Sequence, residues 1–201
     1  MGRAATGGGN KNRESGVYVS GGTFVLTPQQ KLRRFDDEIA PHLGAAYNLA
    51  RWLTGSREDA EDVVQEAFLR AFSALGTLRG AAKPWVLTIV RNTAITWRMR
   101  RGNPMAPVAD EEAVGRACEP GAGPEALAVA AGDRERVRRA LGEIGEEFRE
   151  AIVLRELEGM SYKEIAEVTG VPMGTVMSRL SRGREWLKRR LTSGIGAGEG
   201  R

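Results

Sequence analysis

The sequence predicts an all-α protein made of two small helical domains, a helical bundle and a helix-turn-helix unit, joined by a flexible linker. Apolar residues recur at spacings of three and four over 35–53, 63–72, 85–97 and 137–157, which is the period of amphipathic helices. Residues 103–132 are rich in Pro, Gly, Ala and acids, a composition typical of a linker. A chain of 201 residues is long enough for two such domains.

Composition and isolated residues exclude several classes of function. The formal net charge of +4 and the pI of about 9.6 are compatible with nucleic-acid binding. Cys118 is the single cysteine and His42 the single histidine, and neither has the neighbours of a zinc site or a catalytic base. We therefore expect no metal, no cofactor and no enzymatic activity. Because no apolar run approaches the length of a membrane span or a signal-peptide core, we expect a cytoplasmic protein without membrane insertion.

An arm over 1–26, rich in Gly, Asn, Ser and Arg, is expected to be mostly disordered and to precede the first domain at 27–102. Thr27 opens a T-x-x-Q capping box with Pro in the first turn, which predicts a helix start. This helix should run to Thr54 and bend where Pro41 interrupts its apolar stripe.

The second helix of this domain carries an acidic face. Ser56 begins an S-x-x-D pattern that predicts the helix start. Its predicted buried stripe consists of Val63, Ala67, Phe68, Ala71 and Phe72. Asp59, Asp62 and Glu66 lie on another face, where nothing supplies the His ligands and polar second shell of a metal site. We interpret these acids as solvent-facing or partner-facing groups that also suit the helix macrodipole.

A third helix, opened by Pro84, is apolar at first and strongly basic at its end. Its apolar side includes Trp85, Ile89, Thr93 and Trp97 at four-residue steps, and its basic end spans Arg98–Arg101. Arginines interleaved with Trp are typical of surfaces that bind single-stranded or distorted DNA. The alternative, which we favour for both tryptophans, is that Trp85 and Trp97 are core residues.

The linker at 103–132 is acidic and allows a short helix around 125–131. After it, a second domain is expected at 133–191, followed by a disordered Gly-rich tail at 192–201. Helical periodicity over 137–157 leads into the helix-turn-helix. Two tethered domains suit bipartite binding, because tethering makes the second contact intramolecular.

The segment Tyr162–Arg190 has the layout of a helix-turn-helix. Ser161 opens an S-x-x-E capping box, Gly170 supplies the turn, and Pro172 fits the first turn of the next helix. One face of that helix is apolar and comprises Val176, Leu180, Gly183, Leu187 and Leu191. The opposite face carries Thr175, Ser178, Arg182 and Arg189, with Arg179 on the flank. This mixture of hydroxyls and guanidinium groups favours major-groove binding over the alternative of a solvated basic helix.

Three blocks of sequence resemble the extracytoplasmic-function (ECF) group of the sigma-70 family of bacterial RNA polymerase sigma factors. They are AEDVVQEAFLRAF at Ala60–Phe72, PWVLTIVRNTAITWRMRR at Pro84–Arg101, and YKEIAEVTGVPMGTVMSRLSRGREWL at Tyr162–Leu187. The resemblance covers roughly 35–191, and three such blocks in this order are specific. The sequence departs from the family pattern at Thr96, where many relatives carry Asp. It also has Ile144-Gly145 in place of Leu-Pro, and we interpret this second departure as a difference in local helix-entry geometry.

The resemblance implies a promoter-specificity subunit with sigma region 2 at 27–102 and sigma region 4 at 133–191. Implied contacts with the polymerase clamp helices fall on Asp62, Gln65 and Glu66. Implied contacts with the melted minus-10 strand fall on Asn92, which matches the pocket for a flipped base, and on Thr88, Arg91, Arg98, Arg100 and Arg101. Implied contacts with the minus-35 major groove fall on Thr175, Ser178, Arg179 and Arg182.

The partners that the resemblance implies are core RNA polymerase, through its clamp helices and flap, double-stranded promoter DNA, the melted minus-10 strand and an anti-sigma factor. A monomer is expected. Three alternatives remain open: a stand-alone helix-turn-helix regulator that binds operator DNA, an adaptor that binds polymerase without DNA, and a small helical enzyme. The enzyme is disfavoured because the one His and the one Cys are far apart in the chain.

Overall fold

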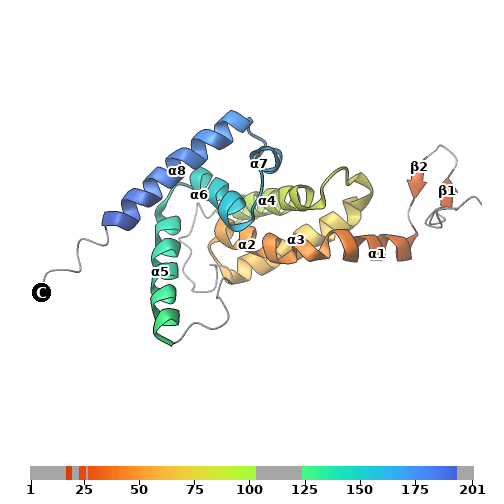
Figure 1. The fold of residues 1–201 in the computed structure, drawn as a ribbon. Helices are drawn as coiled ribbons and strands as arrows, with labels where there is room; N and C mark the ends of the chain where they lie inside the picture. The colour runs from red at the N-terminus through yellow and green to blue at the C-terminus, as the bar shows by residue number, and fades with distance from the viewer. Residues whose placement is uncertain (1–16, 20–22, 26, 103–123, 194–201) are drawn as a thin grey trace, which may run out of the picture.

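The computed structural model describes residues 17–19, 23–25, 27–102 and 124–193, and it confirms the all-α class (Figure 1). The N-terminal unit comprises α1 (Pro28–Glu38), the short turn η1 (Ala40–His42), α2 (Leu43–Thr54), α3 (Arg57–Ala74), η2 (Leu75–Thr77) and α4 (Ala82–Arg101). The C-terminal unit comprises α5 (Pro124–Glu143), α6 (Glu146–Ile152), the π-helical turn η4 (Val153–Leu157), α7 (Tyr162–Thr169) and α8 (Met173–Ser193).

A short hairpin departs from the helical pattern. Strands β1 (Val17–Val19) and β2 (Thr23–Val25) pair antiparallel, with Val17 opposite Val25. These two strands, of three residues each, lie within the arm that is expected to be mostly disordered. Their β-branched and aromatic residues favour extended backbone.

The predicted helix starts after Thr27 and Ser56 are confirmed, whereas the third helix begins at Ala82, two residues before the predicted Pro84. The predicted bend at Pro41 is a break between two helices. Thr27 Oγ1 accepts from the Gln30 backbone N–H at 3.2 Å, and Gln30 Oε1 accepts from the Thr27 N–H at 2.9 Å. Ser56 Oγ accepts from the Asp59 N–H at 3.3 Å. At Pro41 the chain leaves the α-helix for η1, because proline cannot donate the backbone hydrogen bond of a helix interior.

The expected linker contains the helix that its sequence allows around 125–131, and this helix continues into the C-terminal unit. Helix α5 begins at Pro124, so residues 124–132 of the expected linker are helical, consistent with the high helix propensity of their alanines. The remaining linker residues, Cys118 among them, lie outside the described residues. Gly145 separates α5 from α6 with φ −55° and ψ 143°, which places the change of helix direction at the predicted Ile144-Gly145 position.

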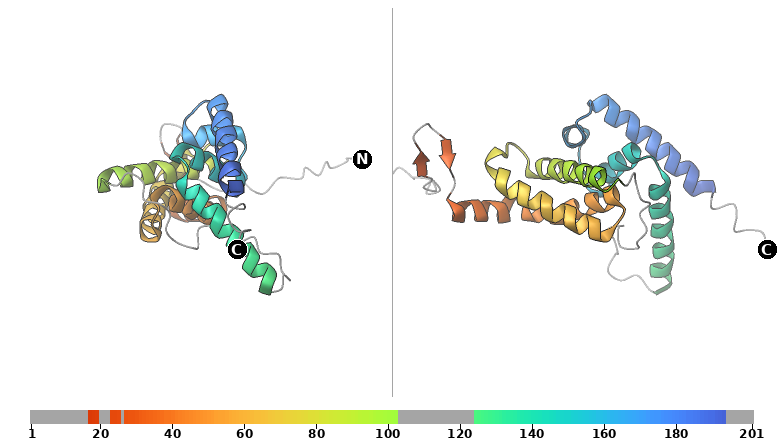
Figure 2. Two further views of the ribbon diagram at one scale, coloured as in Figure 1. Left: turned by 90° about the vertical axis from the view of Figure 1, so that its left-hand side faces the viewer. Right: turned by 180° about the vertical axis from the view of Figure 1, so that it is seen from behind.

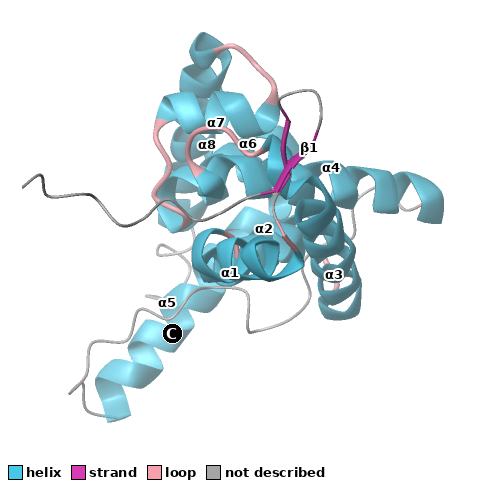
Figure 3. Ribbon diagram, turned by 90° about the vertical axis from the view of Figure 1, so that its right-hand side faces the viewer, coloured by secondary structure: helices cyan, strands magenta, loops and turns pink. Residues whose placement is uncertain are grey.

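The two units pack against each other. Helices α2, α3 and α4 form the N-terminal bundle, α4 lies beside α7, and α2 contacts α6 (Figure 1). The buried apolar residues of both units form one continuous cluster, from Leu49 and Val90 in one unit to Ile152 and Leu180 in the other. Helices α1 and α5 extend from this packed centre in different directions (Figure 2, Figure 3).

Two tryptophans of α4 line the core as favoured from the sequence. Trp85 and Trp97 are each partly buried and pack against the apolar cluster. The guanidinium of Arg101 lies over the Trp97 ring, 5.0 Å from its centroid. The exposed end of α4 therefore combines a core aromatic with a surface cation.

Candidate nucleic-acid and partner interfaces

The helix-turn-helix forms as the sequence predicts. Ser161 Oγ accepts from the Glu164 N–H at 3.3 Å, and Glu164 Oε2 accepts from the Ser161 N–H at 2.7 Å, so the capping box is complete. Gly170 makes the turn at φ +69°, a conformation that costs glycine little. Pro172 lies immediately before α8, outside its first turn, and its carbonyl accepts from the Thr175 N–H at 2.8 Å.

The inward face of α8 is tightly packed. Val176, Leu180 and Gly183 are buried, as the helical period predicts. A Cβ atom at Gly183 would lie 2.7 Å from Cδ1 of Ile152, so any side chain at this position would have to displace the end of the Ile152 side chain. This packing fixes which side of α8 can face a ligand.

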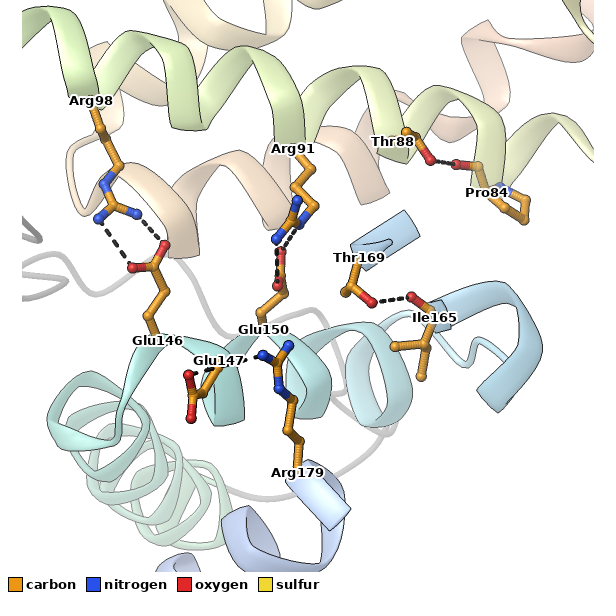
Figure 4. Close-up of polar contacts among 10 residues, drawn as sticks. All are labelled: Pro84, Thr88, Arg91, Arg98, Glu146, Glu147, Glu150, Ile165, Thr169 and Arg179. Carbon is orange, nitrogen blue, oxygen red and sulfur yellow. Dashed lines mark hydrogen bonds and ion pairs between the residues drawn. The ribbon is translucent and has the colours of Figure 1, made fainter. Parts of the chain in front are cut away.

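The outward face of α8 contains three of the four predicted minus-35 residues. Ser178 and Arg182 are exposed and Thr175 is partly buried. Arg179 is different, because its side chain is only 22% exposed and its Nη2 lies 4.0 Å from Oε2 of Glu147 on α6 (Figure 4). Arg179 is therefore directed toward α6 and away from the open face.

Two of the predicted minus-10 arginines face the C-terminal unit. Arg91 Nε donates to Glu150 Oε1 at 2.5 Å, and Arg98 donates through both terminal nitrogens to Glu146, with Nη2 3.1 Å from Oε2 (Figure 4). The Arg91 and Arg98 side chains are only 21% and 17% exposed. Both guanidinium groups thus bind carboxylates on α6.

The remaining predicted minus-10 residues lie elsewhere on α4. Asn92 and Arg100 are exposed. Thr88 Oγ1 donates to a carbonyl in the preceding turn at 2.8 Å, and Arg101 pairs with Asp59 of α3. The structure therefore divides the predicted set into exposed groups and groups that are already paired.

Three acids on α6 were not identified from the sequence. Glu146, Glu147 and Glu150, here called the α6 acids, each have an arginine partner from the predicted DNA-binding sets. The Glu150 side chain is 5% exposed. Its burial raises the pKa of the Glu150 carboxyl, while the hydrogen bond and charge of Arg91 oppose that shift. The E-E-x-x-E spacing of these glutamates is visible in the sequence. No sequence pattern indicates, however, that two of them pair with arginines of α4, on the other side of the linker.

Arg149 was also missed, and it joins the C-terminal unit to the N-terminal one. It is 2% exposed, and its guanidinium donates to the carbonyls of Leu141 at 2.7 Å, Gly142 at 2.8 Å and Ile144 at 3.0 Å. Its Nη1 reaches the carbonyl of Trp52 in α2 at 3.5 Å. These carbonyls include the free end of α5, so a side chain replaces the missing helical donors. Burial lowers the pKa of Arg149.

The acidic face of α3 is open and contains an unexpected apolar residue. Asp62 and Gln65 are exposed, while Glu66 pairs with Arg70 one turn along the helix. Leu69 follows on the same face with 65% of its surface exposed. A single exposed leucine is common on protein surfaces, so Leu69 is a candidate contact only together with the open polar groups beside it.

Other candidate residues give no second site. His42 is partly buried, and burial together with the charge of Lys83 lowers its pKa. Among the described residues, no group of His, Cys, Asp and Glu is arranged to hold a metal ion. Within those same residues, none of the helices has the length and apolar character to cross a membrane.

Two family matches cover the two helical units. Residues 39–103 match Sigma-70 region 2, and residues 134–187 match Sigma-70, region 4. The first match covers α2–α4 with the preceding turn, and the second runs from the second half of α5 to within the last turns of α8.

Individual relatives agree with these matches. The ECF RNA polymerase sigma factor SigE of Mycolicibacterium smegmatis is 33% identical over 161 residues, and the aligned part covers 80% of this chain and 62% of that relative. The ECF RNA polymerase sigma-E factor of Escherichia coli is 40% identical over 136 residues, covering 63% of this chain and 71% of that relative. This chain thus spans less than two thirds of the mycobacterial relative.

A solved structure supports the same relationship. RpoE of Bartonella quintana, a sigma factor crystallised with the anti-sigma factor NepR, superposes with a TM-score of 0.63 and 26% sequence identity, covering 80% of this chain and 98% of that chain. The chain therefore belongs to the ECF group of the sigma-70 family of RNA polymerase sigma factors, which are non-enzymatic factors of transcription initiation.

Proposed function

We propose that this chain binds core RNA polymerase and directs it to a specific set of promoters in the cytoplasm. In this proposal, α8 reads the minus-35 element in the major groove and α4 binds the melted minus-10 strand. Helix α3 contacts the clamp helices, the C-terminal unit contacts the flap, and the protein acts as a monomer.

The observation that carries this proposal is the division of α8 into two faces. Its buried side is held against α6 by Val176, Leu180 and Gly183, while Ser178 and Arg182 remain open to solvent. A helix that is fixed on one side and presents hydroxyl and guanidinium groups on the other can enter a major groove.

The exposed face of α3 supports the polymerase contact. Asp62 and Gln65 are open to solvent beside Leu69. Polar groups around an exposed leucine suit a protein partner better than DNA, whose phosphates would repel the acids.

An anti-sigma partner belongs to the same proposal. The Bartonella quintana relative was crystallised with one, and both units of this chain would be accessible to such a protein. We propose that an anti-sigma factor silences this chain by covering both units.

The test is transcription with purified core polymerase, the full chain and fragmented genomic DNA, with sequencing of transcript 5′ ends. We expect new start sites that share minus-35 and minus-10 elements. Arg182→Ala should weaken use of these promoters by about 1–3 kcal/mol if Arg182 contacts a base. Arg184→Ala is the matched control, because Arg184 lies on the same helix but pairs with Glu156 inside the C-terminal unit.

The outcomes separate this proposal from its alternatives. Absence of any sigma-dependent transcript would overturn it. Tight, specific binding of duplex DNA by the chain alone, without polymerase, would favour the stand-alone regulator. Unchanged promoter selectivity in Arg182→Ala would favour an adaptor that binds polymerase without reading DNA.

A further inference from the structure

Helix α8 carries two exposed methionines beside the predicted minus-35 residues. Met173 is 52% exposed and Met177 is 50% exposed. Met160, in the same unit, is by contrast 2% exposed and belongs to the apolar core. Because methionine stabilises a fold mainly when it is buried, the two exposed side chains contribute little to the core of the free chain. Their role is therefore to be sought on the surface of α8.

Exposed residues of α8 form two parallel rows. Residues four positions apart in a helix lie above one another on the same side. One row contains Met173, Met177 and Ser181, the adjacent row contains Gly174, Ser178 and Arg182, and all of these residues are exposed. Met177 is therefore the neighbour of Ser178 and shares an open face with Arg182.

Met177 lies near the end of α8 that would contact bases. It is the fifth residue of the helix, within the first two turns. In a helix-turn-helix, the N-terminal residues of the second helix contact base edges in the major groove. Gly174 lies one turn earlier, and no atom lies within 4 Å of the position that its Cβ would occupy. The surface beside Met177 is thus open to a close approach of DNA.

The charges around Met177 suit DNA. The sequence has no Asp or Glu over 173–184, and the first acid of α8 is Glu185, which lies 3.7 Å from the guanidinium of Arg189. DNA phosphates repel carboxylates and attract guanidinium groups such as that of Arg182. The exposed apolar surface of Met177 therefore lies on a part of α8 that phosphates would not repel.

The side chain of Met177 is chemically suited to one of the four bases. Only thymine presents a methyl group in the major groove. Methionine has no hydrogen-bond donor and only a weakly accepting sulfur. Beside another base it would exclude water from polar base atoms without replacing their hydrogen bonds, which is unfavourable. Beside thymine it would bury apolar surface on both molecules, which is favourable.

We propose that Met177 is a specificity-determining residue whose side chain packs against the C5-methyl group of a thymine in the minus-35 element. This inference rests on the proposed function of α8 as the reader of that element. Ser178 and Arg182 supply polar contacts to neighbouring bases or phosphates, whereas Met177 selects an A·T base pair through an apolar contact. The promoters that this chain selects therefore share a thymine in the minus-35 element.

The test removes single methyl groups from the DNA. Promoters found by the transcription experiment are synthesised with one minus-35 thymine at a time replaced by deoxyuridine, which lacks the methyl group but pairs with adenine in the same way. A thymine between the two promoter elements, replaced likewise, is the control. At one minus-35 thymine, transcription by core polymerase with the full chain should fall about three- to fivefold, as expected for the loss of one buried methyl contact. The control replacement should change nothing.

Variants of the chain then assign the contact to Met177. Met177→Ala should transcribe the thymine and deoxyuridine templates equally, because the side chain that contacts the methyl group is gone. Met177→Leu keeps an apolar side chain and should keep the preference for thymine. Leu32→Ala, at a leucine that is 53% exposed on α1, is the matched control and should also keep it. The ratio between the two templates is the readout, because a loss of folding would lower both rates alike.

The outcomes separate this inference from the proposed function. It is overturned by minus-35 elements that share no thymine on either strand, or by wild-type transcription that is insensitive to deoxyuridine at every minus-35 position. A preference for thymine that persists in Met177→Ala overturns it as well. In each of these cases sigma-dependent transcripts still form, so the proposed function stands. Absence of any sigma-dependent transcript means instead that the proposed function fails, and the contact by Met177 fails with it.

Discussion

The Glu150 carboxylate accepts two hydrogen bonds from the Arg91 guanidinium, at 2.5 and 3.4 Å, at a site where the Glu150 side chain is 5% exposed. Arg91 on α4 favours the charged carboxylate, as does Arg179 on α8, whereas burial and Glu146 on the same helix disfavour it. Burial is the largest of these effects, so the pKa of Glu150 is raised above the ordinary 4.5.

This raised pKa predicts the pH dependence of stability. An acid whose pKa is higher in the folded state contributes stability below its unfolded pKa, and that contribution is lost as pH rises through the folded value. Glu150→Gln, which is neutral at all pH values, should therefore become progressively more stable relative to wild type as pH rises from 4.5. Urea unfolding of both proteins over a pH series measures the difference. If wild type instead becomes more stable relative to Glu150→Gln as pH rises, the stabilisation of the charged Glu150 carboxylate by Arg91 outweighs the effect of burial.

Glu164 is predicted to affect the pH dependence of stability in the opposite direction, because its pKa is lowered. Hydrogen bonds from the Ser161 hydroxyl and backbone lower the pKa of Glu164. Its contribution to stability is present above the unfolded pKa and is lost as pH falls through the folded value. In the same unfolding series, Glu164→Gln should become less stable relative to wild type as pH rises. Parallel trends for the two variants would contradict this assignment.

Among the charged residues, Arg149 is the one whose substitution we predict to lower the free energy of unfolding most. Replacing it with Leu leaves the buried carbonyls of Leu141 and Ile144 without a donor, and each unsatisfied acceptor costs about 1–3 kcal/mol. We expect a loss of about 3 kcal/mol in the free energy of unfolding, measured in urea. Arg139→Leu is the control, because the Arg139 side chain is 65% exposed and should change stability by less than about 0.5 kcal/mol. Equal effects of the two substitutions would show that the carbonyl contacts contribute little.

Local signals explain why much of the fold could be predicted from sequence. The capping residues Thr27, Ser56 and Ser161 act through neighbours three residues away, so the sequence itself contains both partners. The inward face of α8 follows from helical period alone, and the same period indicated the outward Ser178 and Arg182.

Contacts between distant segments explain what was missed. Glu150 and Arg91 are separated by 59 residues, and nothing in either helix indicates that they meet. The inward turn of Arg179 depends on Glu147 of a different helix. Similarly, the exposure of Leu69 depends on which sides of α3 its neighbours cover, and the helical period does not specify those neighbours.

Gly183 is predicted to be intolerant of larger side chains. Its Cβ position lies 2.7 Å from Cδ1 and 3.3 Å from Cγ1 of Ile152, so Gly183→Val must displace the Ile152 side chain. Overpacking of this kind costs about 1–3 kcal/mol. Gly174→Ala on the same helix is the control, because no atom lies within 4 Å of its Cβ position, and it should be neutral or stabilising by up to about 1 kcal/mol. Urea unfolding measures both, and a neutral Gly183→Val would show that the Ile152 side chain moves aside at little cost.

Leu69 is predicted to contribute to polymerase binding without contributing to stability. It is 65% exposed, so Leu69→Ala removes little buried surface from the free chain. If the leucine is covered by the clamp helices, the substitution should weaken binding to core polymerase by about 1.5–3 kcal/mol, the value of burying such a side chain. Leu43→Ala, at a leucine that is 50% exposed on α2, is the matched control. Titration of labelled chain with core polymerase measures the affinity of each variant, and equal affinities for Leu69→Ala and wild type would place the polymerase contact on another face of α3.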